Sequence, residues 1–352
     1  MDIMPTEQPQ TPTVVPINAT KLRKKKETIY FILVLIVSAA VWAGAFWGLW
    51  HSITAITTKP TIDESGLCFG QSFDGGSAFI VPDAYKQTYL DEGESCIAPS
   101  TLDPEQREAA LKEYRQEAEK INEEDAGFSV LFFILIGFLL FGFLMHLYAL
   151  AFVRMTGVRV GPDQFSGVWN SAQRLAARLG MKKVPDVFIL NGEGMLNAFA
   201  TKLISRKIVV LFSDLAEALS EPENQLQLDA VLAHELGHHA LGHTKLYHWL
   251  LYPGEFIPFI SLSLSREREY SADRVMQALI ENQESYERGL IKLAAGKTFG
   301  NLANIDRYID QIKQERGFMV KWAEYFSSHP FLPKRIRELR RYKEFLDQSP
   351  KI

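Results

Sequence analysis

The chain has 352 residues, of which 47% are hydrophobic, and a formal net charge of −4 at pH 7. This charge gives no electrostatic argument for nucleic-acid binding, which a strongly basic face would indicate. The two cysteines are Cys68 and Cys96, so a metal site would have to use histidine and carboxylate ligands instead of a cysteine cluster. Much of the apolar composition lies in two blocks near the N-terminus, which indicates a membrane protein with a soluble remainder.

The N-terminal region predicts a tail followed by a first membrane helix. Residues 1–27 lack apolar periodicity and end in the basic cluster 21–26, which is typical of a disordered tail. Residues 28–50 contain no charge and are long enough to cross a hydrocarbon layer of about 30 Å. A cleaved signal peptide is the alternative, but the apolar run is too long and no clear cleavage site follows it.

A second uncharged apolar run, residues 128–153, predicts a second membrane helix. His146 lies within it, and we interpret this residue as an imidazole that reaches the membrane interface. The segment between the spans, residues 51–127, contains both cysteines and a helix that is predicted to start with Asp103 as N-cap and Pro104 as first helical residue.

Basic residues predict the orientation in the membrane. The cluster 21–26 precedes the first span, and Arg154 and Arg159 follow the second, so the positive-inside rule places both ends in the cytoplasm. We therefore expect a multi-pass protein of the cell (inner) membrane, with residues 51–127 extracytoplasmic. A Cys68–Cys96 disulfide is possible there, because that compartment is oxidising.

Residues 155–345 have the composition of a soluble domain, with mixed helix and strand signals. Helical spacing runs over 166–179 and ends at Gly180. Residues 186–190 and 208–212 predict buried strands, and residues 196–201 an edge strand. Ser220 and Glu223 have the spacing of a capping box, which predicts a helix from there to about residue 243. The expected fold is α+β: two N-terminal transmembrane helices followed by a mostly helical domain with a small β-sheet.

The central motif is His234-Glu235-Leu236-Gly237-His238. Positions i and i+4 lie on one face of a helix, so both imidazoles can bind one ion. A carboxylate beside a zinc-bound water can take its proton, and this is why the spacing carries peptidase chemistry. Gly237 is expected to leave little bulk beside the metal. The apolar turns before His234 predict a buried helix, which argues against incidental surface histidines.

A catalytic zinc needs a third protein ligand. A third histidine in the spacing of the metzincin motif is excluded, because Leu241 and Thr244 occupy the required positions. His239 and His243 are interpreted as ordinary helix-surface histidines. A later helix offers Glu269 and Asp273, an i, i+4 pair in which Glu269 can bind metal and Asp273 can orient a ligand or an arginine. Glu267 lies on another side of that helix and is the weaker candidate.

Segment 187–338 resembles the HtpX-like and CAAX prenyl protease family of membrane-bound zinc metallopeptidases. The resemblance is carried by residues 197–200, 230–238, 269–273 and 328–330, and by Arg335 with Ile336. It implies one zinc ion per chain, bound by His234, His238 and Glu269, with Glu235 as the general base. It further implies three lesser roles: His329 assists the transition state, Arg335 pairs with Asp273, and the cleft strand that binds substrate contains Asn197, Ala198 and Phe199.

The resulting expectation is a membrane-anchored zinc endopeptidase that cleaves protein or peptide substrates beside the lipid bilayer, in membrane-protein quality control. Two alternatives stay open: an exopeptidase with the same site, and a membrane adaptor with structural zinc. Many HtpX-like proteins carry two further membrane helices after the histidine motif. Here residues 247–264 are interrupted by Pro253 and Pro258, so we expect a helical hairpin that rests on the membrane or over the cleft.

Overall fold

The structure is a computed structural model that describes residues 16–57, 68–71, 78–81, 103–203, 206–245, 250–315 and 317–348. The chain forms two compact units, one from residues 1–39 and 141–352 and the other from residues 40–140. The motifs predicted to form the site all belong to the first unit, and each unit is described by itself.

The smaller unit contains parts of two long helices and a hairpin. α1 (Lys25–Thr57) and α3 (Pro104–Thr156) each extend from it into the larger unit. Strands β1 (Cys68–Gln71) and β2 (Ala78–Val81) pair antiparallel. Cys96 and the side chain of Cys68 lie outside the described residues, and so does the possible disulfide.

Both long helices contain a stretch that is long and apolar enough to cross a membrane, Lys25–Trp50 and Phe132–Thr156. These stretches overlap the predicted spans 28–50 and 128–153. α3 also begins at Pro104, where the sequence predicted a helix start, because proline tolerates the first helical position, where its missing N–H is not needed.

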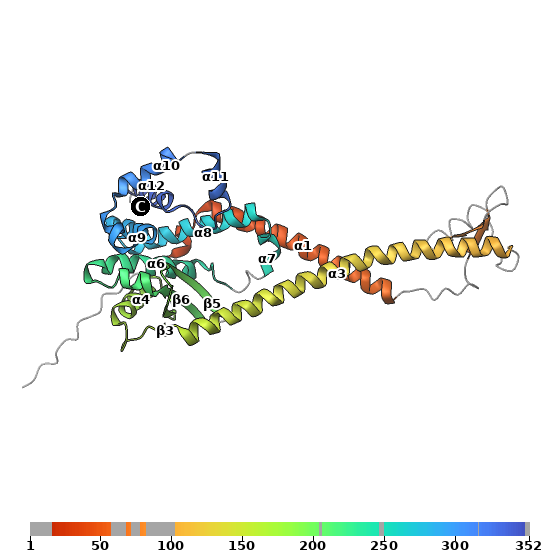
Figure 1. Cartoon of the computed structure of the whole chain (residues 1–352), viewed down its shortest axis with the longest axis horizontal. Helices are drawn as coiled ribbons and strands as arrows, with labels where there is room; N and C mark the ends of the chain where they lie inside the picture. The colour runs from red at the N-terminus through yellow and green to blue at the C-terminus, as the bar shows by residue number, and fades with distance from the viewer. Residues whose placement is uncertain are drawn as a thin grey trace, which may run out of the picture. The chain divides into compact units, whose positions relative to one another are not determined.

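The larger unit is built on a four-stranded mixed sheet of order β3-β4-β6-β5 (Figure 1). The strands are β3 (Val158–Arg159), β4 (Asp186–Leu190), β5 (Ala198–Leu203) and β6 (Arg206–Phe212). β4 and β6 are parallel, whereas β3 and β5 pair antiparallel with their neighbours. β4 and β6 contain the two predicted buried strands, and β5 lies at the edge, as predicted.

Both faces of β6 are buried, which explains its continuous apolar run. Val209 and Leu211 belong to the main core, together with α4 (Ser166–Arg178) and α6 (Gln225–Leu241). Ile208 and Val210 pack instead with residues near the end of α3. Successive strand residues point to opposite faces, so a strand covered on both sides has no polar alternation.

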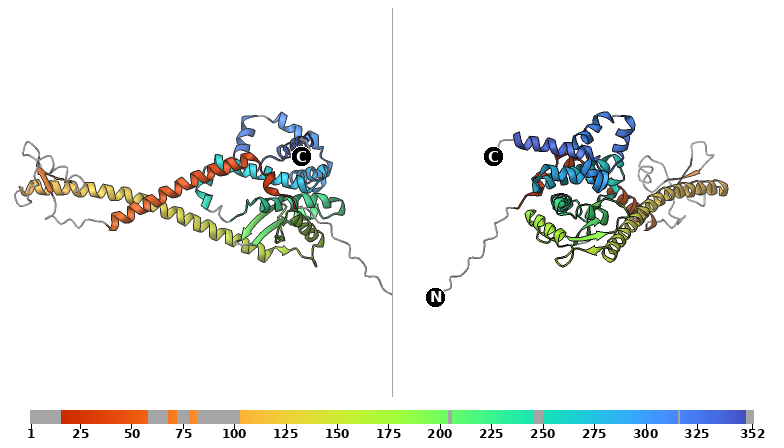
Figure 2. Two further views of the ribbon diagram at one scale, coloured as in Figure 1. Left: turned by 180° about the vertical axis from the view of Figure 1, so that it is seen from behind. Right: turned by 60° about the vertical axis from the view of Figure 1, so that its left-hand side comes forward.

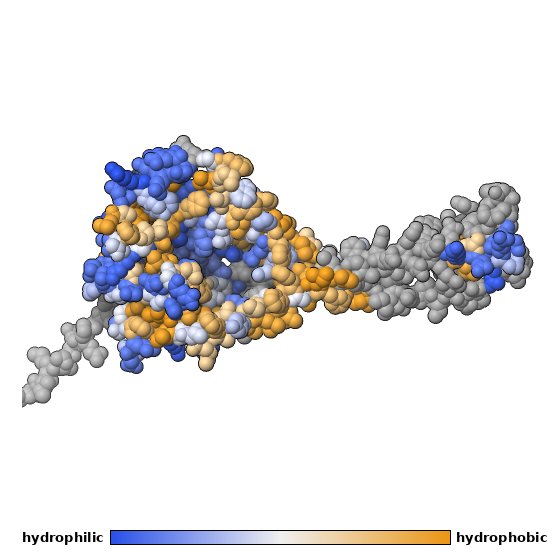
Figure 3. All heavy atoms as spheres, viewed as in Figure 1, coloured by the Kyte–Doolittle hydropathy of each residue, from blue (hydrophilic) through white to orange (hydrophobic). Residues whose placement is uncertain are grey.

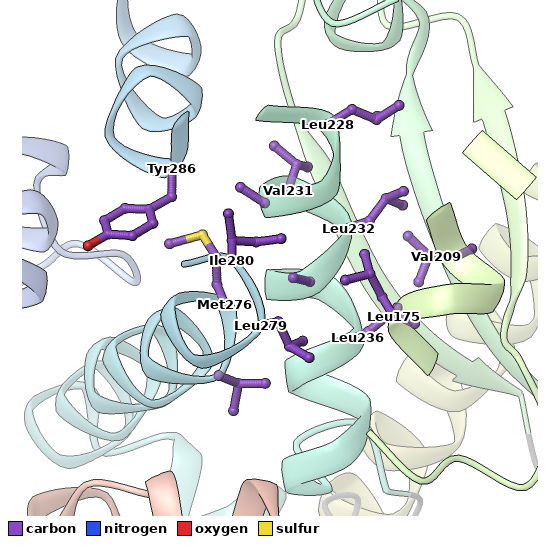
Figure 4. Packing of buried hydrophobic residues seen from close by; sticks show 14 of the residues in the cluster. Leu175, Val209, Leu228, Val231, Leu232, Leu236, Met276, Leu279, Ile280 and Tyr286 are labelled. Carbon is purple, nitrogen blue, oxygen red and sulfur yellow. The ribbon is translucent and has the colours of Figure 1, made fainter. Parts of the chain in front are cut away.

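α6 runs through the centre of the core, between the sheet and α8 (Pro258–Leu279). Figure 4 shows Leu232 and Leu236 directed toward Leu175 and Val209, and Val231 directed toward Met276. Each fully buried leucine contributes about 1.5–3 kcal/mol relative to an exposed one. A helix buried on all sides holds the residues of its motif in fixed positions.

Gly237 has a different role from the predicted one. A Cβ at this position would lie 3.2 Å from Val275 Cβ and 3.4 Å from the carbonyl oxygen of Ala272, both on α8. The glycine therefore lets α6 and α8 approach closely, and it does not serve to leave room beside a metal. This close approach brings Glu269 of α8 to the histidines of α6.

Further helices complete the larger unit. They are η1 (Ala19–Leu22), α5 (Ser213–Ala218), η4 (Pro222–Asn224), α7 (Tyr252–Glu255), α9 (Gln283–Leu302), α10 (Ile305–Gln314), α11 (Phe318–Tyr325) and α12 (Leu332–Gln348). Helices α9 to α12 lie on the side of α6 that faces away from the sheet (Figure 2). The site is thus enclosed between the sheet edge, α6, α8 and the C-terminal helices.

The prediction of a disordered tail through residue 27 is wrong for residues 16–27. Ala19 is buried, and Ile17 and Leu22 pack against the same core. The backbone N–H of Ile17 donates to the carbonyl oxygen of Arg178 at 2.7 Å. These apolar side chains are too few to create a periodic pattern, yet burying them fixes the segment. Residues 1–15 lie outside the described part.

The predicted capping box at Ser220 is also wrong. The Ser220 hydroxyl donates backward to the carbonyl oxygen of Glu217, at 2.9 Å. Pro222 then begins a short 3-10 turn, and α6 itself starts at Gln225. The serine therefore closes the preceding helix α5 and does not cap α6.

Residues 250–264 form α7 and the first turns of α8, which pack against α1. The Ser38 hydroxyl donates to the carbonyl oxygen of Leu251 and accepts from the N–H of Gly254, each at 2.9 Å. Val34 is buried with Leu251 and Leu264. Figure 3 shows apolar residues gathered on the side of the unit where α1 leaves it. The sequence predicted a helical hairpin over residues 247–264, whereas the described residues form the one-turn helix α7 followed by the start of the 22-residue helix α8.

Candidate metal and active site

His234 and His238 present their imidazoles together on α6. Their Nε2 atoms lie 3.1 Å apart, and the rings meet nearly edge to face. His234 is buried and only 8% exposed. Because the two residues are one helical turn apart on a buried helix, they are held with little freedom.

Glu269 approaches the same point from α8. Its Oε2 lies 3.3 Å from His234 Nε2, and its Oε1 lies 3.3 Å from His238 Nε2. A tetrahedral zinc ion with bonds of 2.0–2.1 Å separates its ligand atoms by about 3.3–3.4 Å. The spacing and the donor set of two imidazoles and one carboxylate therefore fit a single zinc ion. Glu267 is directed elsewhere and pairs with Lys24 at 3.3 Å.

The electrostatics of Glu269 favour the ionised form that a ligand needs. Burial opposes ionisation, but the adjacent imidazoles of His234, His238 and His329 hold the pKa of Glu269 well below its ordinary value. Burial raises the pKa of Glu235, by contrast, and the nearby His234, His238 and Arg335 offset this only in part. The pKa values of these two carboxylates are thus shifted in opposite directions. This is typical of sites in which one carboxylate is a ligand and another transfers protons.

Asp273 and Arg335 form a buried ion pair behind His234. Arg335 Nε and Nη2 contact the two carboxylate oxygens of Asp273 at 2.8 and 2.6 Å. Asp273 Oδ1 also lies 3.0 Å from His234 Nδ1. A carboxylate that accepts from Nδ1 directs the lone pair of Nε2 toward the metal position. Arg335 Nη1 reaches Glu269 Oε2 at 3.3 Å and links the pair to the third ligand position.

His329 lies just before α12, with its Nδ1 3.3 Å from Glu269 Oε2. Its side chain is 65% exposed, whereas those of His234, His238 and Glu269 are 10%, 14% and 8% exposed. The hydrogen bond with Glu269 raises the pKa of His329. The structure therefore places a largely exposed imidazole with a raised pKa at the rim of the cluster.

A cavity of about 290 Å³ opens beside the cluster. Glu235 lines it together with Asn197, which directly precedes β5, and with Ala198 and Phe199 at the start of β5. β5 pairs with β6 on one side only, so its other edge is unpaired within the described sheet. The predicted substrate residues thus lie at an open strand edge that faces the proposed metal ligands.

The interpretation of His239 and His243 as surface histidines is wrong. His239 is buried, and its Nε2 bonds the carbonyl oxygen of Ile208 at 3.1 Å, which ties α6 to the sheet. His243 Nδ1 lies 2.9 Å from His238 Nδ1, and His243 Nε2 lies 3.0 Å from Glu27 Oε1. Burial lowers the pKa of both histidines to about 3. Neither the contact of His243 with His238 nor its contact with Glu27 was predicted from the sequence.

His146 does not belong to the site. Its Nε2 donates to the carbonyl oxygen of Lys202 at 3.2 Å, which attaches α3 to the end of β5. The contact accounts for a polar residue within the apolar stretch of α3, since it satisfies the ring nitrogen without a catalytic role.

This combination of a buried His-Glu-x-x-His helix, a glutamate from a second helix and two long apolar helices defines a membrane zinc metallopeptidase. Two segments, residues 162–252 and 250–343, match the sequence model of Peptidase family M48. The matched segments span more than half of the chain, and the protein therefore belongs to Peptidase family M48.

Other comparisons add little to this assignment. The crystal structure of S. mikatae Ste24p aligns with 18% sequence identity and a TM-score of 0.40, over 89% of this chain and 80% of that chain. No curated protein gives a significant match.

Proposed function

We propose that this M48 peptidase is an endopeptidase that hydrolyses internal peptide bonds of membrane-associated or unfolded proteins. The observation that carries the proposal is the position of Glu235, a buried carboxylate at the same cavity as the His234, His238 and Glu269 cluster. A purely structural zinc site needs no such base beside an accessible cavity.

His234, His238 and Glu269 are the proposed ligands of one zinc ion per chain. When bound, zinc supplies Lewis acidity, which lowers the pKa of water toward about 7 and polarises a carbonyl. Asp273 fixes the orientation of His234 from behind, and Arg335 holds Asp273 in place. The carboxylate of Glu269 is kept ionised by its neighbours and is therefore ready to serve as a ligand.

Glu235 is the proposed general base and acid. Burial raises its pKa, so the carboxylate is more basic than an exposed glutamate and can accept a proton from water. The same group can then deliver the proton to the leaving amine. His329, which its contact with Glu269 favours in the protonated form, is in position to donate a hydrogen bond to an oxyanion that develops in the cavity.

The open edge of β5 is the proposed substrate-binding element. An extended peptide can add to an unpaired strand edge through main-chain hydrogen bonds, which do not depend on the peptide sequence. Ala198 and Phe199 line the cavity beside Glu235. A substrate bound along β5 would therefore pass the base as an internal segment and would not need a free terminus.

We place the catalytic unit on the cytoplasmic side of the cell membrane, with residues 51–127 on the other side and with quality control of membrane proteins as the setting. The support is the basic cluster at residues 21–26 and the resemblance to HtpX-like proteases. A phosphatase reporter inserted at residue 90, which is active only outside the cytoplasm, is expected to be active. An inactive reporter there, together with an active one at the C-terminus, would reverse the orientation.

The endopeptidase proposal predicts zinc-dependent cleavage of peptides that have no free ends. The full-length protein in detergent is stripped of metal with a chelator and then assayed with and without added zinc. The substrates are an unfolded membrane protein and a quenched fluorescent peptide blocked at both termini, with the same peptide unblocked as a control. We expect cleavage at internal bonds only after zinc is restored, at similar rates for blocked and unblocked peptides.

The alternatives give different results in the same assay. Release of single residues from the unblocked peptide only would identify an exopeptidase. No cleavage of any substrate by protein that binds one zinc per chain would support a structural metal and overturn the peptidase proposal. Mass spectrometry of the products separates these outcomes.

A further inference from the structure

The end of α6 folds back on itself, and this places His243 against His238. Gly242 has a φ of 81°, the left-handed conformation that terminates many helices and that glycine adopts without strain. The N–H of His243 then bonds the carbonyl oxygen of His238 at 3.0 Å. The two rings lie with centroids 5.0 Å apart and their Nδ1 atoms 2.9 Å apart.

Glu27, the third residue of α1, contacts the other side of the His243 ring. Its Oε1 lies 3.0 Å from His243 Nε2, and its side chain is only 1% exposed. Arg23, four residues earlier and before the start of α1, donates to the same oxygen. A continuous series of hydrogen bonds therefore joins the start of the first membrane helix to a proposed metal ligand.

The donors and acceptors in this series have one consistent order. The Glu27 carboxylate can only accept, so His243 Nε2 carries the hydrogen. In a neutral imidazole the other nitrogen, His243 Nδ1, is then an acceptor, and His238 Nδ1 must be the donor. The Nε2 of His238 consequently keeps its lone pair, and this atom faces His234 and Glu269.

The start of α1 is fixed to the catalytic unit by further contacts. The backbone N–H of Lys24 donates to the Ser271 hydroxyl at 3.0 Å, and Lys24 Nζ pairs with Glu338 at 3.0 Å. Arg23 also donates to the carbonyl oxygen of Leu241, the last residue of α6. Glu27 is thus held by contacts with α6, α8 and α12 that are independent of its own carboxylate.

We propose that Glu27 is a positioning residue for the metal ligand His238, acting through His243, so that attachment of the first membrane helix to the catalytic unit strengthens metal binding. This inference rests on the proposed zinc site. Asp273 makes the equivalent contact with His234 directly. Each ligand histidine therefore has its own carboxylate, one from α8 and the other from the membrane anchor.

Metal affinity of the full-length protein in detergent tests the inference. Zinc and cobalt dissociation constants are measured by competition with a chromophoric chelator for wild type, Glu27→Leu, His243→Leu and the double variant. Loss of an outer hydrogen-bond partner of a ligand histidine typically weakens metal binding by about 10–100-fold. We expect each single variant to fall in that range and to change the visible absorption spectrum of bound cobalt.

The double variant distinguishes a connected series from two separate effects. If Glu27 acts through His243, removing both should weaken binding no more than His243→Leu alone. Additive losses would overturn the inference, and so would unchanged affinity and spectrum in Glu27→Leu. Glu27→Gln, whose amide oxygen can still accept from His243, should lie between wild type and Glu27→Leu, and it provides the test if the leucine variant fails to fold.

Glu287→Leu is the matched control. Glu287 is a buried carboxylate, 2% exposed, paired with Arg340, which is 31% exposed; the corresponding exposures for Glu27 and Arg23 are 1% and 28%. This control should change thermal stability without changing metal affinity. A wild type that binds zinc but cleaves nothing would refute the proposed function, and the affinity comparison would still decide the role of Glu27.

Discussion

Replacement of Glu235 by glutamine is expected to lower kcat/KM for a blocked peptide by about 10²–10⁴-fold, the usual contribution of a positioned general base. The change keeps the size of the side chain and its ability to form hydrogen bonds, but the amide cannot accept a proton from water. His234, His238 and Glu269 are unchanged, so the variant should still bind one zinc per chain.

Three measurements on the same preparation check this result: steady-state kinetics, zinc content and melting temperature. Burial disfavours the charged form of Glu235 and raises its pKa, so a neutral amide should not destabilise the protein. Glu223→Gln, an exposed carboxylate just before α6, serves as the control and should keep full activity. A Glu235→Gln protein with zinc bound and near-normal kcat/KM would remove Glu235 from the mechanism.

The sequence predicted the features that depend on local pattern. His234 and His238 lie on one face because helical geometry fixes the i, i+4 relation, and the strand patterns at 186–190 and 208–212 persist because both faces of the sheet are buried. Glu269 followed from the same logic together with the family resemblance. The two histidines and the residues of each strand are close in sequence, and Glu269 lies in a recognisable motif of its own.

The interpretation of Gly237 failed because it concerns packing between α6 and α8, which no single segment encodes. His243 was misjudged for a related reason. Its position one turn beyond the motif predicts a surface residue if the helix continues, but the helix ends at Gly242. A glycine directly before a histidine was the available signal, because a left-handed glycine turns the following residue back toward the last helical turn.

The sequence distinguishes Glu27 from its neighbours, but we interpreted this residue as the end of the basic tail. It is the last charge before an uncharged apolar run, and the other charged residues of its cluster are all lysine or arginine. Grouped with a basic tail, it has no predicted partner, and its contact with His243 depends on how α1 docks. Long-range contacts of this kind require the tertiary structure, because the two residues lie in segments with no shared pattern.

The buried pair of Arg335 and Asp273 leads to the second prediction with a large effect, on stability. Arg335→Met should lower the free energy of unfolding by about 3–5 kcal/mol, since it leaves a buried, charged Asp273 without its main partner. Asp273 is 1% exposed and Arg335 is 6% exposed, so solvent water cannot stabilise the unpaired carboxylate of Asp273. For a domain of this size, a loss of about 3 kcal/mol lowers the melting temperature by roughly 6–12 °C.

The double variant Arg335→Met/Asp273→Asn separates the cost of an unpaired charge from the loss of packing. Asparagine keeps an oxygen that can accept from His234 Nδ1 but carries no charge, so the double variant should melt well above Arg335→Met. The comparison is made on metal-free protein at one scan rate, because zinc would add its own stabilisation and membrane proteins often unfold irreversibly. Arg341→Met, an exposed position on the same helix, should melt like wild type. If the single variant also melts like wild type, or the double variant melts no higher than the single one, then Asp273 is not a buried charge that depends on Arg335.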